Sequence, residues 1–173
     1  MNMGELLIRL SIWITLAGYF IGAALLSFSR KKPNLEPKAR LAWTIACLAL
    51  LIHVALAYHF YHHWSQDSAY RETARQTAEV TGLEWGGGVY INYVLIACWV
   101  LDVVWWWRRG LESYRSRSAI LTVIWQAFLI FMIFNATVVF KTGTLRYIGL
   151  ILCFFLCSLW WYSGAASKPD KVI

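Results

Sequence analysis

The sequence predicts an all-α integral membrane protein: a bundle of five transmembrane helices with one short amphipathic helix on the outer face. Of its 173 residues, 60% are apolar and only 14% are charged. A soluble domain contains about 45–50% apolar and about 25% charged residues. Five stretches of the chain also approach the length of about 20 apolar residues that a helix needs to cross the hydrocarbon core of a membrane. The length suits one transmembrane domain over residues 1–173.

The spans are expected to be helices because lipid offers no partner for the backbone groups of an open strand edge. The first span does not resemble a cleavable signal peptide, in which positive charge precedes an apolar core of about 7–15 residues. Here the apolar core is longer, and the basic run follows it. The predicted spans are residues 6–28, 41–64, 89–107, 119–140 and 147–165.

Lys and Arg residues are unevenly divided between the two sides of this arrangement. Eleven of the 16 lie in the segment after the first span, the segment after the third span and the C-terminal tail. Because cytoplasmic loops carry an excess of Lys and Arg, we expect the N-terminus outside and the C-terminus in the cytoplasm. The net charge of +7 suits a cytoplasmic surface that contains anionic lipid. The expected location is a bacterial inner membrane, since the Asn-x-Thr sequence at Asn135 lies within a span.

Residues 65–88 form the long segment outside the predicted spans, and they contain the pattern of a short helix. Ser65, Asp67 or Ser68 is suited to cap its start, and Gly82 is suited to end it. Small Ala and Thr residues recur between them at helical spacing, with Arg and Glu on another side. A stripe of small residues favours packing on protein over insertion into lipid. We therefore expect this helix to lie across the outer ends of the spans.

Histidine is confined to the second predicted span and its outer end. His59, His62 and His63 have the i, i+3, i+4 spacing that places imidazoles on one helix face, where they can chelate a metal. The alternative is three interfacial imidazoles that hydrogen-bond to water or headgroups. The string His59-Phe60-Tyr61-His62-His63 resembles one histidine box of the membrane desaturases and hydroxylases. That resemblance would imply several such boxes around a di-iron centre. This sequence has no second box, so no family is assigned.

His53 lies deeper in the same span. One hypothesis is an axial ligand to haem, because imidazole binds haem iron well. A bis-histidine site would then need a second subunit, since the other spans contain no His. The alternative is a neutral His53 that hydrogen-bonds to a neighbouring helix, for example to Asn135.

Further polar residues fall in the outer half of the predicted bundle. Such groups usually face the bundle interior, so they predict a polar cluster that either holds a substrate, a quinone or an ion, or fixes helix packing. In the cytoplasmic half, Asp102 is expected to pair with Arg108 or Arg109. The predicted outer-half cluster consists of Arg9, Asn92, Tyr93 and Asn135.

Small residues and tryptophans add two expectations about packing. Gly18 and Gly22 form a Gly-x-x-x-Gly pattern, and Ala42 and Ala46 form a second small pair. Small residues let helices approach closely in lipid, either within the bundle or between subunits. Tryptophans prefer the headgroup level of the membrane, so the indoles near the cytoplasmic boundary are expected to be anchors. They include Trp43, Trp105, Trp106 and Trp107.

The sequence favours a non-enzymatic scaffold or a small subunit of a membrane complex. It contains no phosphate-binding glycine loop, no nucleophile motif and no paired-carboxylate site. The alternative is a redox component that binds a transition metal or haem through the His cluster. Expected partners are the lipid bilayer and either further copies of the chain or a larger complex. Nucleic acid is not expected, because no basic segment accompanies a soluble module.

Overall fold

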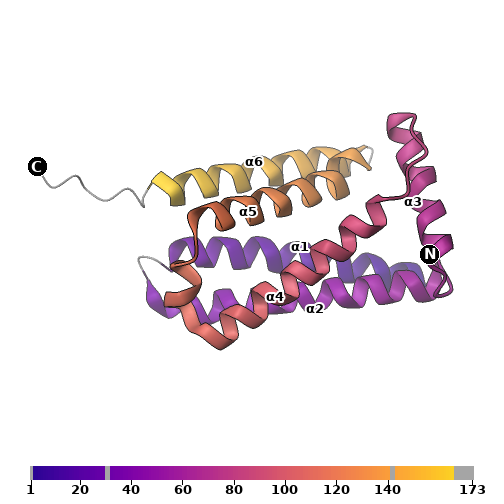
Figure 1. Cartoon of the computed structure of the whole chain (residues 1–173). Coiled ribbons are helices and arrows are strands. Elements are labelled where there is room, and N and C mark those ends of the chain that lie inside the picture. The colour runs from indigo at the N-terminus through magenta and orange to yellow at the C-terminus, as the bar shows by residue number, and fades with distance from the viewer. Residues whose placement is uncertain (1, 30–31, 141–142, 166–173) are drawn as a thin grey trace, which may run out of the picture.

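The computed structural model describes residues 2–29, 32–140 and 143–165 of the chain. All regular structure within these ranges is helical, as Figure 1 shows. The elements are α1 (Met3–Phe28), the 3-10 turn η1 (Pro33–Leu35), α2 (Glu36–Phe60), α3 (Gln66–Thr81), α4 (Gly88–Arg115), α5 (Ala119–Phe134), the π-helical turn η2 (Asn135–Val139) and α6 (Thr144–Ala165).

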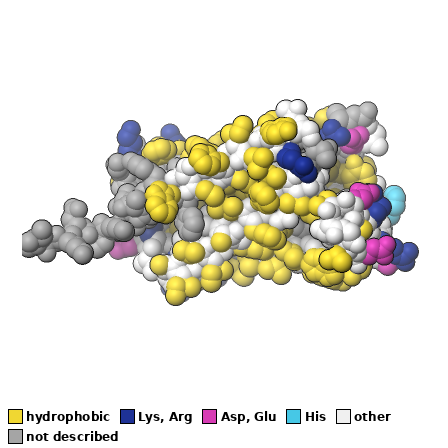
Figure 2. All heavy atoms as spheres, turned by 90° about the horizontal axis from the view of Figure 1, so that it is seen from above, with side chains coloured by type: hydrophobic (Ala, Val, Ile, Leu, Met, Phe, Trp, Pro, Cys, Tyr) yellow, Lys and Arg dark blue, Asp and Glu magenta, His cyan; other side chains and the backbone are white. Residues whose placement is uncertain are grey.

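Four apolar segments are long enough to cross a membrane, and they overlap the first four predicted spans. The fifth predicted span falls on α6, where the apolar stretch Arg146–Ser158 is shorter. Hydrophobic side chains cover the middle of the face seen in Figure 2, and most charged side chains lie toward its two ends. The chain is therefore an all-helical protein whose apolar helices are compatible with membrane insertion. The four long segments are Met3–Phe28, Pro33–Phe60, Gly88–Arg115 and Ala119–Val139.

The helices α1 and α2 form an antiparallel pair that lies side by side in Figure 1. Small residues make this close approach feasible. A Cβ atom on Gly18 would lie 3.0 Å from the carbonyl oxygen of Ala42 and 3.0 Å from the Cβ of Ala46. A Cβ on Gly22 would lie 3.1 Å from the Trp43 ring. Of the two alternatives for the small-residue pattern, the structure thus shows packing within the chain.

Helix α3 lies in the segment where the sequence predicts a short helix, and its ends are at the predicted capping residues. The side chain of Ser65 accepts a hydrogen bond from the backbone N–H of Ser68, and Gly82 ends the helix with a φ of 79°. Ser at the N-cap and Gly in the left-handed conformation after the last turn are the local signals that begin and end a helix. The helix runs across the ends of the longer helices in Figure 1.

Helix α4 extends past the predicted end of the third span and contains a break. At Gly110 the backbone has φ 73° and ψ −179°, a conformation that is accessible mainly to glycine. The chain turns sharply there, and a short helical segment leads on toward α5 (Figure 1). This turn returns residues 111–117 toward the apolar bundle and so positions the site described next.

Candidate functional site

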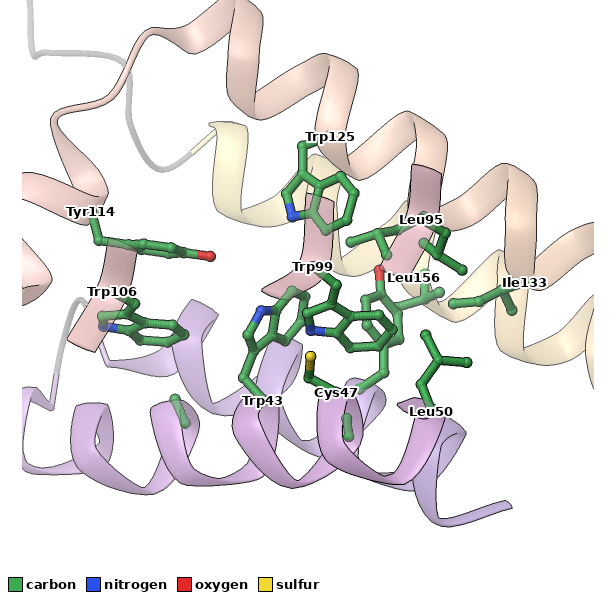
Figure 3. Packing of buried hydrophobic residues seen from close by; sticks show 14 of the residues in the cluster. Trp43, Cys47, Leu50, Leu95, Trp99, Trp106, Tyr114, Trp125, Ile133 and Leu156 are labelled. Atoms are coloured by element: carbon green, nitrogen blue, oxygen red, sulfur yellow. The ribbon is translucent and has the colours of Figure 1, made fainter. Parts of the chain in front are cut away.

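Asp102 is a carboxylate buried among aromatic side chains where α2, α4 and the turn after Gly110 meet. It is only 8% exposed. An ionisable group inside an apolar bundle is a functional candidate by default, since its burial is costly unless it is paired. The aromatic surroundings are shown in Figure 3, where Trp43, Trp99 and Trp106 lie below Tyr114 and Trp125.

Three side chains from different parts of the chain donate hydrogen bonds to Asp102. The indole Nε1 of Trp43 on α2 lies 2.9 Å from Oδ2. The hydroxyl of Tyr114, beyond Gly110, donates to the same oxygen at 2.9 Å. Arg117 Nη1 lies 2.5 Å from Oδ1 and completes an ion pair. Charge-assisted hydrogen bonds of this kind are stronger than those between neutral groups.

Aromatic rings enclose this ion pair. The ring of Tyr114 stacks on Trp106 with centroids 4.3 Å apart and an interplanar angle of 15° (Figure 3). The guanidinium of Arg117 lies over the Tyr114 ring at 4.1 Å. Trp106 Nε1 in turn donates to Glu36 Oε1 at 2.9 Å, which ties α4 to the first turn of α2. The stack shields the carboxylate from water and strengthens its interaction with the cation.

Arg117 stays cationic in this environment. Burial disfavours its charged form, but the interactions with Tyr114 and Asp102 outweigh that effect and raise the pKa of Arg117 above its ordinary value. The site is therefore a carboxylate–guanidinium pair in which both partners are engaged by the chain itself. Such an arrangement can hold the segment after Gly110 against α2 and α4.

The sequence predicted an arginine partner for Asp102 but named the wrong one. Arg108 and Arg109 are exposed, and Arg117 forms the pair. The cause is the turn at Gly110, which directs the chain back toward Asp102. Trp43 and Trp106 were expected at the headgroup level, but both are fully buried. Their indole N–H groups donate to the buried carboxylate of Asp102 and to the half-buried carboxylate of Glu36.

The three histidines of the predicted metal cluster do not share a helix face. Helix α2 ends at Phe60, before His62. His63 has a φ of 47°, so the chain has left helical geometry at that point. The nitrogen Nδ1 of His62 lies 3.4 Å from Ser68 Oγ, and the His59 ring packs against Phe60. Within the described ranges, no group of three or more His, Cys, Asp or Glu side chains is arranged to hold a metal ion.

His53 lies against α1 and not beside Asn135. Its Nδ1 is 3.0 Å from the carbonyl oxygen of Ile8 and 3.3 Å from Ser11 Oγ. The side-chain amide of Asn135 donates to the carbonyl of Phe131, one turn back in its own helix, at 2.7 Å. The general expectation of a hydrogen bond to a neighbouring helix is confirmed, and the expected partner is wrong.

Among the described residues, no hydrogen bond or ion pair joins the four residues of the predicted outer-half cluster to one another. Arg9 forms an exposed ion pair with Glu5 at 2.5 Å, and Asn92 is exposed. Tyr93 donates to Gln66 Oε1 at 2.5 Å and also hydrogen-bonds to the hydroxyl of Tyr58.

The contacts of Tyr93 define a polar junction where α2, α3 and α4 meet. The Tyr58 hydroxyl also lies 2.6 Å from Gln66 Oε1, so two phenol hydroxyls and one amide oxygen lie within hydrogen-bonding distance of one another. Because each hydroxyl has a single proton, Tyr58 donates either to Gln66 or to Tyr93. Neither Tyr58 nor Gln66 was predicted as a member of a polar cluster. Their positions at the end of one span and the start of the following helix were the available signal.

Comparisons with models of protein families, with curated proteins and with solved structures found no match to this chain. The fold and the site define the class of protein: an all-helical chain with membrane-compatible helices and a buried ion pair that closes one end of the bundle. Functional conclusions therefore depend on the chain's own residues.

Proposed function

We propose that the chain is a non-enzymatic scaffold or a small subunit of a larger membrane complex. The observation that supports this function most is that Asp102 forms its hydrogen bonds and its ion pair within the chain. Its carboxylate accepts from Trp43, Tyr114 and Arg117, so this buried charge joins three parts of one chain. Groups held in this way stabilise a shape that other proteins can pack against.

The proposed arrangement in the membrane has five spans, with α6 as the fifth, in a single transmembrane domain. Helix α3 is the amphipathic helix on the outer face. Its Ala69 is buried and Thr73 is half-buried, while Arg71 and Arg75 are exposed. The N-terminus is outside and the C-terminus is cytoplasmic, in a bacterial inner membrane.

The distribution of charge supports this orientation. In the described ranges, the end formed by the start of α2, the turn at Gly110 and the start of α5 has seven Lys and Arg residues against three carboxylates. The end that contains α3 has four Arg residues against five carboxylates. The positive-inside rule places the first end in the cytoplasm. Arg30, Lys31, Lys141, Lys168 and Lys171 also entered the sequence argument, but they lie outside the described residues.

The mass of the purified assembly tests the proposed function. The protein would be extracted from membranes with a mild detergent and measured by native mass spectrometry. We expect a defined complex heavier than the 20.0 kDa chain, either with further copies or with a partner at fixed stoichiometry. Recovery of the single chain alone, across detergents and concentrations that preserve its unfolding temperature, would contradict the proposal.

The second candidate is a redox component that binds a metal or haem through His53, His59, His62 and His63. Elemental analysis and visible absorption of the purified protein distinguish the two candidates. We expect less than about half an equivalent of transition metal or haem, because a tight site of several histidines retains its ion during purification. A stoichiometric signal that disappears in the His59→Ala, His63→Ala double variant would favour the redox component instead.

A further inference from the structure

One end of the molecule presents a surface of positive charge that we call the basic end. Two contacts bring its parts together: Arg40 on α2 lies 4.1 Å over the Trp107 ring on α4, and Trp106 Nε1 donates to Glu36 at 2.9 Å. The start of α2 and residues 108–109 of α4 therefore belong to one surface. The basic end consists of Lys32, Lys38, Arg40, Arg108 and Arg109.

None of the three carboxylates near the basic end forms an ion pair with its exposed cations, and the exposed Glu112 forms no ion pair with any described residue. Asp102 is paired with Arg117. Glu36 receives the Trp106 N–H and lies 3.9 Å from Arg40. The exposed cations of this end form no ion pair with any residue that the structure describes. They are Lys32, Lys38, Arg108 and Arg109.

The opposite end of the molecule behaves differently. Arg9 pairs with Glu5 at 2.5 Å, Arg71 pairs with Asp67 at 2.6 Å, and Arg75 pairs with Glu72 and Glu79. Arg9, Arg71 and Arg75 are thus compensated by carboxylates of the chain, whereas the exposed cations of the basic end have no such partner among the described residues. The two ends therefore differ in how many of their cations form ion pairs as well as in how many cations they carry.

The first turn of α2 contains one carboxylate, Glu36, which is engaged by Trp106 and Arg40 and leaves the nearby Lys38 without an ion pair among the described residues. Lys38 lies in the first turn of α2, and Arg40 follows in the second. A helix N-terminus carries partial positive charge, so cations there are unfavourable and anions are favourable. The N-cap residue Leu35 offers no side-chain acceptor. The buried Nε of Arg40 has no hydrogen-bond acceptor among the described residues.

Aromatic residues next to the basic end indicate which anion it fits. Trp107 is 52% exposed and Trp105 is 47% exposed, and Trp107 Nε1 donates to Thr44 at 2.9 Å. Exposed indoles prefer the boundary between headgroups and acyl chains. Apolar Leu41, in the turn after Lys38, is also exposed. A ligand with a phosphate and an adjoining apolar body matches this combination better than a small free anion does.

We propose that the basic end binds the phosphate of an anionic phospholipid, with Lys38 and Arg40 on α2 and Arg108 on α4 as the recognising cations. This inference goes beyond the proposed function, because it identifies a lipid ligand whatever protein the chain assembles with. It requires only that this end lie at a membrane surface.

Native mass spectrometry of the detergent-solubilised protein tests the inference, with phosphatidylglycerol as the anionic lipid and phosphatidylcholine as the neutral comparison. We expect tighter binding of phosphatidylglycerol. In the Lys38→Gln, Arg108→Gln double variant that binding should weaken about 25-fold, because each cation at an anionic surface contributes about fivefold. Both side chains are exposed, and the unfolding temperature confirms that the variant folds.

The matched control is the Arg71→Gln, Arg75→Gln double variant, which removes two charges from the opposite end and should retain phosphatidylglycerol binding. Equal binding of the two lipids by the unmodified protein would overturn the inference. So would an equal loss in the control variant. Displacement of the lipid by millimolar inorganic phosphate would assign the surface to free anions instead. The proposed function is tested separately by the mass of the assembly, so either proposal can fail alone.

Discussion

At the scale of single residues, the ion pair of Asp102 and Arg117 is the most consequential interaction. Their side chains are 7% and 10% exposed, so each charge depends on the other. A buried pair adds little net stability compared with apolar residues of similar size, but breaking it leaves one charge uncompensated. The pair therefore specifies how the chain folds back after Gly110 more than it adds to the total free energy of unfolding.

The high cost of breaking the pair, compared with its small net contribution to stability, predicts the outcome of a double-mutant cycle. Arg117→Met should lower the free energy of unfolding by about 3–5 kcal/mol, because it leaves the Asp102 carboxylate buried without a cation. Asp102→Leu should lower the free energy of unfolding by a comparable amount, since it leaves the Arg117 guanidinium buried without a carboxylate. The double variant should cost clearly less than the sum of the two. Denaturant unfolding in detergent measures all three, and strictly additive losses would contradict a coupled pair.

A second prediction at this scale concerns the pH dependence of α3. The hydrogen bonds and charge of Arg75 lower the pKa of Glu72 from its ordinary 4.5 to about 2. A lowered pKa in the folded state means that the pair stabilises α3 fully above about pH 4.5 and loses that contribution as the pH falls through about 2. The side chain of Arg75 is 58% exposed and that of Glu72 is 38% exposed, so solvent screening keeps the contribution to stability small.

Carboxyl NMR of the labelled protein measures this pKa directly. We expect Glu72 to titrate near pH 2, and we expect Arg75→Gln to move its pKa back toward the ordinary value. Arg71→Gln is the matched control, because Arg71 pairs with Asp67. A Glu72 that titrates near 4.5 in the unmodified protein would show that the ion pair does not form in solution.

At the scale of elements, helix ends set by neighbouring residues could be predicted from the sequence. Ser65 and Gly82 define α3 through contacts within a few residues, so their signals are visible in the chain. The end of α2 at Phe60 was missed, because the apolar and aromatic pattern continues to Trp64 while the backbone turns at His63. The metal cluster was argued from that continued helix, so one boundary error changed the geometry of the predicted site.

The partner of Asp102 could not be predicted for a related reason. Gly110 follows a long apolar helix, and nothing next to it in sequence distinguishes a tolerated glycine from a break. Its positive φ returns the chain so that Arg117, fifteen positions from Asp102, becomes its neighbour. Pairing over one helical turn can be inferred from spacing, but pairing across a chain reversal depends on tertiary structure.

The α1–α2 pair gives a prediction at the scale of elements. Gly18→Leu should destabilise the protein by about 1–3 kcal/mol or more. Even a Cβ atom added at this position would lie 3.0 Å from the carbonyl oxygen of Ala42 and from the Cβ of Ala46 on α2. Ala17→Leu is the matched control, since Ala17 is exposed on the same helix. Thermal unfolding in detergent compares the two. Equal stability of both variants would mean that the glycine face does not contact α2.

At the scale of the whole molecule, ion pairing differs between the two ends of the bundle. The end with α3 is compensated by its own carboxylates, whereas the basic end carries exposed cations without described partners. A membrane with anionic lipid on its cytoplasmic side attracts the second kind of surface. Counting Lys and Arg along the sequence predicted the excess of positive charge at the basic end. Only the three-dimensional structure shows which cations form ion pairs within the chain.

The orientation predicts which end a membrane-impermeant thiol reagent reaches in intact cells. Gln76→Cys places a thiol on the exposed side of α3, and Glu112→Cys places one beyond Gly110; both positions are exposed. With the N-terminus outside, Gln76→Cys should be labelled at once, and Glu112→Cys should be labelled only after the membrane is permeabilised. The unmodified protein, whose four cysteines are free and within the apolar helices, supplies the background. The reverse pattern would invert the orientation and place the basic end outside, whereas labelling of both positions before permeabilisation would mean that the two ends do not lie on opposite sides of a membrane.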